Sequence, residues 1–434
     1  MVFLEKIFEN KAVLALQRAG ERMAGSKFFT GVSGGLMGAM GFMLLGALFQ
    51  ILATLLSMVG LIDEAGAFYQ FLITPYNMSM GIISVIASFG IGYVYARVNK
   101  MKSPLSSGIV SAVLFMMVAA PAETVVLADG SEITAMNTLS LGGAGLFTAI
   151  IIGLLSVKIT KFCVDKKWVI KMPDVVPSFL SDSFSALIPL VINVVIFHGL
   201  NFLAMTFMGA NLPLIIMGIL SIPLGAVNSI GGAFLASMFA LALWLTGIHG
   251  TMVVFIALMP LYIQVITQNG ALVAAGGEAV FHPVMLALLN STVGGTGCTL
   301  GLVLLGLRSK SEQIKAVSKA ALIPGLFNIN EPVAFGMPTV YNPILAIPYI
   351  VAPMVITLLG WVGYLTGILK PGYIMMLSLL PLGMAEFLST LSWTNLVFPF
   401  LMIPVSAVIY YPFYKIYERQ LVAKETAAKA EAEA

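Results

Sequence analysis

The chain has 434 residues, of which 59% are hydrophobic and only 9% are charged, and its mean hydropathy is +1.00. Soluble globular proteins carry roughly 25% charged residues, so this composition excludes an ordinary water-soluble domain and indicates a chain built for lipid. The formal net charge of +3 is too small to suggest a nucleic-acid partner. The placement of the charges along the chain is therefore more informative than their sum.

Long stretches without a charged residue mark the expected membrane spans, because a transmembrane helix needs ~20 mostly apolar residues. Such stretches cover residues 28–62, 65–96, 103–122, 133–157, 183–277, 279–307, 332–369 and 387–414. The window 183–277 alone holds 95 residues and has room for several crossings. We expect an all-α polytopic membrane protein of about ten transmembrane helices, with re-entrant hairpins and amphipathic interfacial helices.

Basic residues predict the orientation of these spans, because Lys and Arg concentrate in cytoplasmic loops. Apart from Lys370, they fall within residues 6–27, 97–102, 158–171, 308–319 and 415–429. The loops between the first three clusters contain no Lys or Arg and carry the acids Asp63, Glu64, Glu123, Asp129 and Glu132. Two spans fit between each of those clusters, so we expect all five clusters and both termini in the cytoplasm.

Three polar segments should lie outside the bilayer. Charged and apolar residues alternate over the first 27 residues, which predicts an amphipathic helix on the inner surface rather than a cleavable signal peptide. The stretch 158–182 is too polar to cross and should follow the same interface. The Ala/Glu/Lys-rich end, residues 421–434, should form a solvated cytoplasmic tail.

The two halves of the chain differ in the regularity of their apolar segments. Spans up to about residue 205 are uninterrupted, whereas Pro, Gly and Asn break the later ones at PLGAVNSIGG (223–232), NSTVGGTG (290–297) and PGLFNINEP (324–332). Irregular backbone persists at membrane depth only where protein or a water-filled cavity satisfies its polar groups. Transporters build binding sites from such broken helices, so we expect the site in the second half.

His249 is the first candidate ligand in chain order. It lies inside the longest uncharged window, between Gly247 and Gly250, and imidazole both donates and accepts hydrogen bonds, as a sugar hydroxyl requires. The alternative role is an interhelical hydrogen bond. Trp244, five residues earlier, could offer its ring to the apolar face of a sugar, although most membrane Trp residues are interfacial anchors.

Glu331 is the strongest single signal. The nearest charged residues along the chain are Lys319 and Lys370, and an acid at the bilayer centre costs ~2.5–3.5 kcal/mol on insertion scales unless it faces a cavity or partner. Asn328 and Asn330 add amide groups to what could be a polyol-binding cluster. The alternative is an acid near the interface, or one that pins a re-entrant turn.

Glu386 and Trp393 complete the candidates. Glu386 is a second isolated acid, and Trp393 is a second possible platform for a sugar ring. The positions of Cys163 and Cys298 predict neither a metal site nor a disulfide. A phosphate-binding P-loop is also absent from the sequence, so we expect no cofactor and no ATP hydrolysis, and energy must come from a partner or a gradient.

The segment GLFNINEPVAFGMPTVYNPILAIPYIVAP (325–353) resembles a known family. Its FNINEP and FGxPxxxNP patterns are similar to the membrane IIC component of the lactose/cellobiose/diacetylchitobiose branch of the bacterial phosphoenolpyruvate-dependent sugar phosphotransferase system. Further matching segments are KMPDVVPSFLSDSFSALIP (171–189), LWLTGIHG (243–250), GGTGCTLGLVLLGLRSKSEQIK (294–315) and YYPFYK (410–415). The resemblance thus extends over most of the chain.

The resemblance implies an elevator-type permease for a disaccharide, expected to be β-linked, in the bacterial inner (plasma) membrane. It implies a homodimer, with residues 1–205 as scaffold and dimerisation domain and residues 206–420 as the moving transport domain. The family's characteristic Glu and His match Glu331 and His249, which are expected to bind the sugar near the hydroxyl that becomes phosphorylated. The phosphate would come from a separate cytoplasmic IIB protein, so this chain is expected to contribute no phosphoryl chemistry of its own.

One segment departs from the family pattern. Where relatives often carry a Trp-Thr-Pro-Pro type motif, this chain has PLGMAEFLSTLSW (381–393), which leaves the sugar identity and the role of Trp393 open. The role of Glu331 also stays open between orienting the attacking hydroxyl and deprotonating it. A proton- or sodium-coupled secondary transporter, with Glu331 and His249 as a proton relay, is the competing interpretation.

Overall fold

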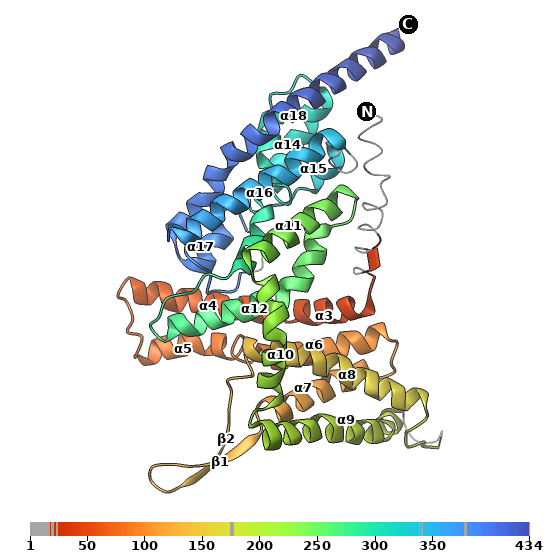
Figure 1. Cartoon of the computed structure of the whole chain (residues 1–434), viewed down its shortest axis with the longest axis vertical. Coiled ribbons are helices and arrows are strands. Elements are labelled where there is room, and N and C mark those ends of the chain that lie inside the picture. The colour runs from red at the N-terminus through yellow and green to blue at the C-terminus, as the bar shows by residue number, and fades with distance from the viewer. Residues whose placement is uncertain are drawn as a thin grey trace. The chain divides into compact units, whose positions relative to one another are not determined.

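The computed structural model describes residue 18 and residues 21–22, 25–173, 178–337, 339, 342–376 and 380–433. Helices dominate this part of the chain (Figure 1), and its one sheet is a two-stranded hairpin. The chain divides into two compact units. The amphipathic helix expected over the first 27 residues falls almost entirely outside the described residues.

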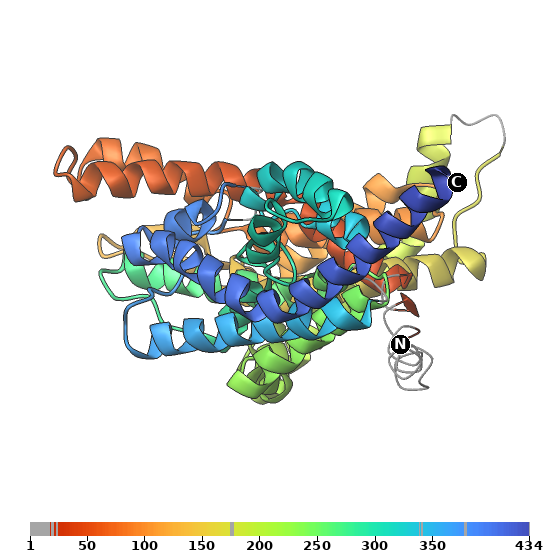
Figure 2. The same cartoon turned by 90° about the horizontal axis from the view of Figure 1, so that it is seen from above.

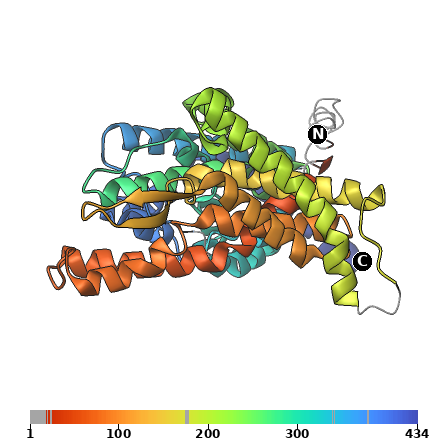
Figure 3. The same ribbon diagram turned by 90° about the horizontal axis from the view of Figure 1, so that it is seen from below.

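The first unit comprises Gly25–Leu224 together with Ile263–Ala271. Its elements are α3 (Lys27–Gly38), α4 (Met40–Met58), α5 (Ala67–Asn77), α6 (Ile83–Val98), α7 (Pro104–Ala119), β1 (Ala122–Val126), β2 (Glu132–Met136), η1 (Gly143–Gly145), α8 (Leu146–Asp165), α9 (Ser178–Met208) and most of α10 (Leu212–Val227). Helix α6 is central, because α3, α7 and α8 all pack against it. The strands β1 and β2 form a hairpin that extends away from these helices (Figure 1), and Figure 3 shows the hairpin from below.

Small and hydroxyl-bearing residues hold these helices together, as is usual where lipid supplies no hydrophobic drive for helix association. The Ser88 hydroxyl donates to the Ser111 carbonyl over 2.9 Å, and the Ser111 and Ser156 hydroxyls are 2.8 Å apart. These bonds join α6, α7 and α8 through buried side chains. Gly35 of α3 and Gly90 of α6 allow their two backbones to approach closely.

The second unit contains Gly225–Tyr262 and Leu272–Ala434. Its elements are α11 (Ile230–Leu245), most of α12 (Gly250–Ala274), η2 (Pro283–Ser291), α13 (Leu300–Gly306), α14 (Glu312–Leu326), α15 (Glu331–Gly336), α16 (Pro343–Leu365), α17 (Met384–Thr390) and α18 (Trp393–Glu433). Helix α18 packs against α16 and α13 around a core that includes Tyr410 and Tyr414. Figure 2 shows α16 running beside the long α18.

The interruptions predicted for the second half are confirmed in the structure. Helices α10 and α11 meet at a 68° bend, and irregular segments separate η2 from α13 and α14 from α15. Gly294, Gly295 and Gly297 have φ of +78°, +80° and +88°, a backbone region that only glycine enters without strain. A Cβ on Gly295 would also come within 2.8 Å of the Asn328 carbonyl oxygen. The irregular backbone of residues 294–297 therefore depends on glycine at positions 294, 295 and 297.

Six described helical segments are long and apolar enough to cross a membrane. The bent pair α10–α11 would make a seventh, and α6 and α7 are shorter apolar helices. The membrane-protein class is thus supported, whereas the expected count of about ten spans stays a prediction. The solvated tail is part of α18, whose 41 residues extend for about 60 Å, roughly twice the ~30 Å bilayer core.

The close approach of α3 and α6 predicts a position-specific effect of one methyl group. A Cβ on Gly35 would collide with the backbone of Ile91, which cannot rotate away, whereas a Cβ on Gly38 of the same helix meets no atom within 4 Å. We expect Gly35→Ala to destabilise the protein by about 1–3 kcal/mol through overpacking. Gly38→Ala should be neutral or slightly stabilising, because Ala favours helix. Thermal unfolding of both variants in detergent, with equal midpoints contradicting the prediction, provides the test.

Candidate functional site

Glu331 and His249 lie side by side in the second unit. Glu331 is the first residue of α15, and His249 immediately precedes α12. The His249 Nε2 is 3.7 Å from the Glu331 Oε1, and the two side chains are 44% and 46% exposed. This distance is too long for a hydrogen bond. The structure therefore brings together the two residues that the sequence analysis ranked first, and leaves both accessible.

The hydrogen bonding of His249 defines which of its nitrogens faces the glutamate. The backbone N–H of Met252 donates to His249 Nδ1 over 3.1 Å, so in the neutral imidazole the proton resides on Nε2. The Nε2–H donor and the carboxylate acceptor of Glu331 thus border the same gap. The Glu331 carboxylate accepts no hydrogen bond from another described residue. A ligand hydroxyl, which donates and accepts at once, is chemically complementary to this pair.

Trp244 forms an apolar wall beside His249. Its ring centroid is 4.4 Å from that of His249, and only 3% of the residue is exposed. The indole packs with Leu241, Ala334 and Tyr349, and among the described residues its Nε1 donor has no hydrogen-bond partner. The indole is therefore almost entirely covered by protein, and its role as a platform for a sugar ring stays a prediction.

Asn328 and Asn330 hydrogen-bond to the backbone of the glycine-rich loop, and their role as sugar ligands stays a prediction. The Gly294 N–H donates to Asn328 Oδ1 over 2.9 Å, and Asn330 Nδ2 donates to the Thr296 carbonyl over 2.8 Å. Asn328 has a φ of +59°, and Asn330 is only 3% exposed. These amides fasten the segment before α15 to the glycine-rich loop 290–297. Both residues belong to the site region, where the structure shows them in structural contacts.

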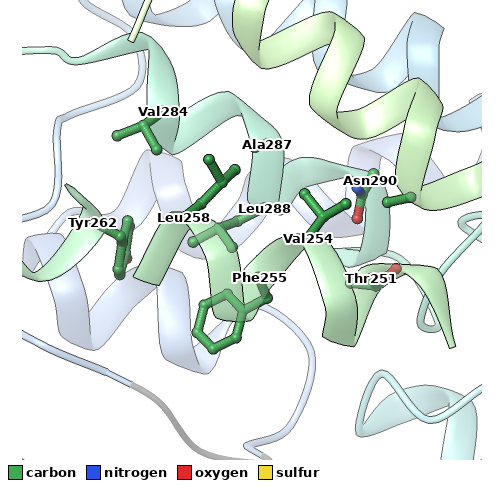
Figure 4. A pocket seen from close by; sticks show the side chains of 10 residues that line it. Thr251, Val254, Phe255, Leu258, Tyr262, Val284, Ala287, Leu288 and Asn290 are labelled. Atoms are coloured by element: carbon green, nitrogen blue, oxygen red, sulfur yellow. The ribbon is translucent and has the colours of Figure 1, made fainter. Parts of the chain in front are cut away.

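The sequence analysis missed three polar residues of the second unit, Thr251, Asn290 and Thr296. The hydroxyls of Thr251 and Thr296 are 2.8 Å apart, and Asn290 has a buried Oδ1 without a partner among the described residues. Thr251 and Asn290 lie at one end of a mostly apolar cavity whose other end reaches Tyr262 (Figure 4). Two of these residues could have been found from the sequence, because Asn290 and Thr296 belong to the irregular segment NSTVGGTG (290–297).

Glu386 and Trp393 contact residues other than Glu331 and His249. Glu386 Oε1 accepts a hydrogen bond from the Thr292 hydroxyl, and its buried Oε2 has no partner among the described residues. This bond joins α17 to the start of the glycine-rich loop. Trp393 is 70% exposed and packs its ring 4.9 Å from that of Phe387. The contacts described for these two residues do not include Glu331 or His249, and their roles as sugar ligands stay predictions.

The described residues contain no group of three or more His, Cys, Asp or Glu side chains that could hold a metal ion. Cys163 and Cys298 are both buried free thiols.

Comparison with known proteins identifies relatives along nearly the whole chain. The family described as "Phosphotransferase system, EIIC" matches residues 33–353. The lichenan permease IIC component of Bacillus subtilis (strain 168) is 31% identical over 431 residues, which cover 93% of this chain and 92% of that protein. The oligo-beta-mannoside-specific EIIC component of the same organism is 32% identical over 355 residues, or 80% and 79% of the two chains.

A solved structure gives the same result for the fold. The crystal structure of ChbC, the IIC component from the N,N'-diacetylchitobiose-specific phosphotransferase system, superposes with a TM-score of 0.85 at 28% identity. The match covers 94% of this chain and 98% of ChbC. The family match, the two relatives and the shared fold lead to one conclusion: this chain belongs to the EIIC family, the membrane permease components of the phosphotransferase system.

Proposed function

We propose that this EIIC protein binds a β-linked disaccharide at the Glu331/His249 pair and carries it across the bacterial plasma membrane by an elevator movement. The observation that carries the proposal is the open 3.7 Å gap between an imidazole N–H and a carboxylate, both accessible and beside the Trp244 ring. Such a gap suits a neutral polyol. The β linkage is supported by the relative whose name specifies oligo-beta-mannosides.

Each member of the pair has a distinct task in this proposal. Glu331 accepts a hydrogen bond from a sugar hydroxyl, and His249 Nε2–H donates to the oxygen of the same or the adjacent hydroxyl. Trp244 covers the apolar face of the ring. Asn328 and Asn330 keep the loop and α15 in register, while Glu386 and Trp393 are assigned to the more distant part of the sugar.

Phosphorylation by a partner makes the transport directional. A phosphorylated cytoplasmic IIB protein donates its phosphoryl group to the bound sugar, with Glu331 orienting or deprotonating the attacking hydroxyl. The product gains ~1.5–2 negative charges, which a carboxylate-containing site disfavours. The sugar phosphate is therefore released to the inside. The basic clusters support a cytoplasmic position for both termini, on the side where IIB acts.

The two halves of the chain have separate roles in the proposal. Residues 1–205 form the scaffold and the homodimer contact, residues 206–420 carry the site, and residues 421–434 form the cytoplasmic end. The division is supported by the compact unit that contains Gly25–Leu224, although this unit also takes in Ile263–Ala271, and by the location of Glu331, His249 and the loop 290–297 within the other unit. Elevator transport needs one rigid body that carries the site as a whole, which the fastened loop 290–297 would provide.

Removal of the Glu331 charge should weaken sugar binding strongly. A hydrogen bond to a charged acceptor contributes about 1.5–3 kcal/mol, so Glu331→Gln is expected to raise the dissociation constant about 10- to 100-fold. Isothermal titration of purified protein with the disaccharide measures this. The matched control is Glu278→Gln, which removes an exposed acid of the same unit and should leave binding unchanged. Wild-type affinity in Glu331→Gln would refute the proposed site.

The substrate class can be measured by a ligand panel. Cellobiose, diacetylchitobiose, lactose and a β-mannoside are added separately to purified protein, and bound ligand raises the unfolding temperature by mass action. We expect at least one of these β-linked sugars to raise the unfolding temperature and maltose, with its α linkage, to have no effect. Stabilisation by maltose alone would contradict the β-linked assignment.

The energy source distinguishes this permease from the competing ion-coupled transporter. Membrane vesicles that contain phosphorylated IIB should accumulate the sugar as its phosphate ester, and vesicles with only a pH or sodium gradient should not. The physical reason is that the charged product cannot return through a site shaped for a neutral sugar. Gradient-driven accumulation of unmodified sugar without IIB would establish the alternative mechanism.

A further inference from the structure

Two carboxylates near the charged end of α18 hold the chain segment that leads into α14. Glu418 is only 4% exposed and accepts four hydrogen bonds. The donors are Ser309 Oγ at 2.7 Å, Lys310 N at 2.9 Å, Tyr414 OH at 2.7 Å and Lys415 Nζ at 2.8 Å. Both oxygens of this carboxylate are therefore engaged, and two of its four bonds cross to the segment before α14.

Glu425 follows Glu418 by seven residues, which places both on the same face of the helix. Its carboxylate accepts from the Ser311 hydroxyl at 2.6 Å and from the backbone N–H groups of Glu312 and Gln313 at 3.1 Å each. The first N–H groups of a helix have no partner within the helix. A negative charge at this end is also stabilised by the positive end of the helix dipole. Glu425 thus acts as an N-terminal cap of α14 supplied from another helix.

Residues 309–313, which Glu418 and Glu425 hold, form the clamped turn. This turn also contacts α15, the helix that begins with Glu331. Gln313 Nε2 donates to the carbonyl of Gly336, the last residue of α15, over 3.1 Å. A Cβ on Gly336 would lie 2.7 Å from the Val317 side chain, so α15 packs directly on α14. At its other end α14 runs into Asn328 and Asn330, which are bonded to the glycine-rich loop. Helix α15 is therefore fastened to neighbouring elements at both ends.

We propose that Glu418 and Glu425 are positioning residues for Glu331. They fix the start of α14, and the Gln313–Gly336 bond together with the α14–α15 packing transmits that position to α15. The inference rests on the proposed function, because it treats Glu331 as the sugar ligand. A ligand carboxylate must stand at a defined place relative to His249, and a small displacement would change a 3.7 Å gap enough to weaken a bridging hydroxyl.

The test compares Glu425→Ala and Glu425→Gln with Glu312→Ala in the full-length protein. Glu312 is an exposed acid in the same helical turn, and its carboxylate forms no hydrogen bond with another described residue, so its removal is the matched control. Amide hydrogen exchange of residues 328–336, followed by mass spectrometry, reports local opening without needing a sugar. We expect faster exchange of this segment in Glu425→Ala, partial recovery in Glu425→Gln, and no change in Glu312→Ala.

The second measurement is the dissociation constant of the disaccharide that stabilises the wild type best in the panel above. Loss of a helix cap predicts that Glu425→Ala weakens binding about fivefold. Faster exchange confined to residues 309–314, or an unchanged dissociation constant, would overturn the positioning role. Failure of the wild type to bind any sugar would instead refute the proposed function, while the exchange of residues 328–336 would still decide whether the clamp controls α15.

Discussion

The second unit depends on one constraint: a backbone that leaves the helical conformation must find partners for its polar groups inside the protein. The segment 328–330 supplies such partners to the loop 290–297. The Asn328 side chain accepts from the Gly294 N–H, and the Asn330 side chain donates to the Thr296 carbonyl. The glycines make the approach possible, and the amides make it specific. The position of Glu331, one residue beyond Asn330, follows directly from this mutual fastening.

Local signals in the sequence predicted the main features correctly. Charge-free windows identified a polytopic helical protein, because each span must be apolar over its own length. Runs of Pro, Gly and Asn located the breaks at 223–232, 290–297 and 324–332, because these residues act on the backbone where they stand. Glu331 and His249 stood out for the same reason, since an isolated polar residue in apolar sequence needs a cause.

Features that arise between distant segments were not predicted. Asn328 and Asn330 were predicted only as sugar ligands, and their bonds to the loop 290–297 were missed because the partners lie more than 30 residues earlier. The bond between Thr292 and Glu386 spans a still longer separation. The hairpin β1–β2 was also not predicted. Its strands are exposed along their length, so they lack the alternation of apolar and polar residues that marks a strand with one buried face. Composition and spacing carry no information about such pairings.

The prolines of α18 give its two halves different mechanical properties. Pro399, Pro404 and Pro412 each remove one N–H donor, so three carbonyls in the apolar half lose their usual helical partner. No proline occurs from residue 413 to the end of the helix. Bending is thus easiest in the apolar half of the helix. A deformation there can be absorbed before residue 413, which would leave Glu418, Glu425 and the start of α14 to move together.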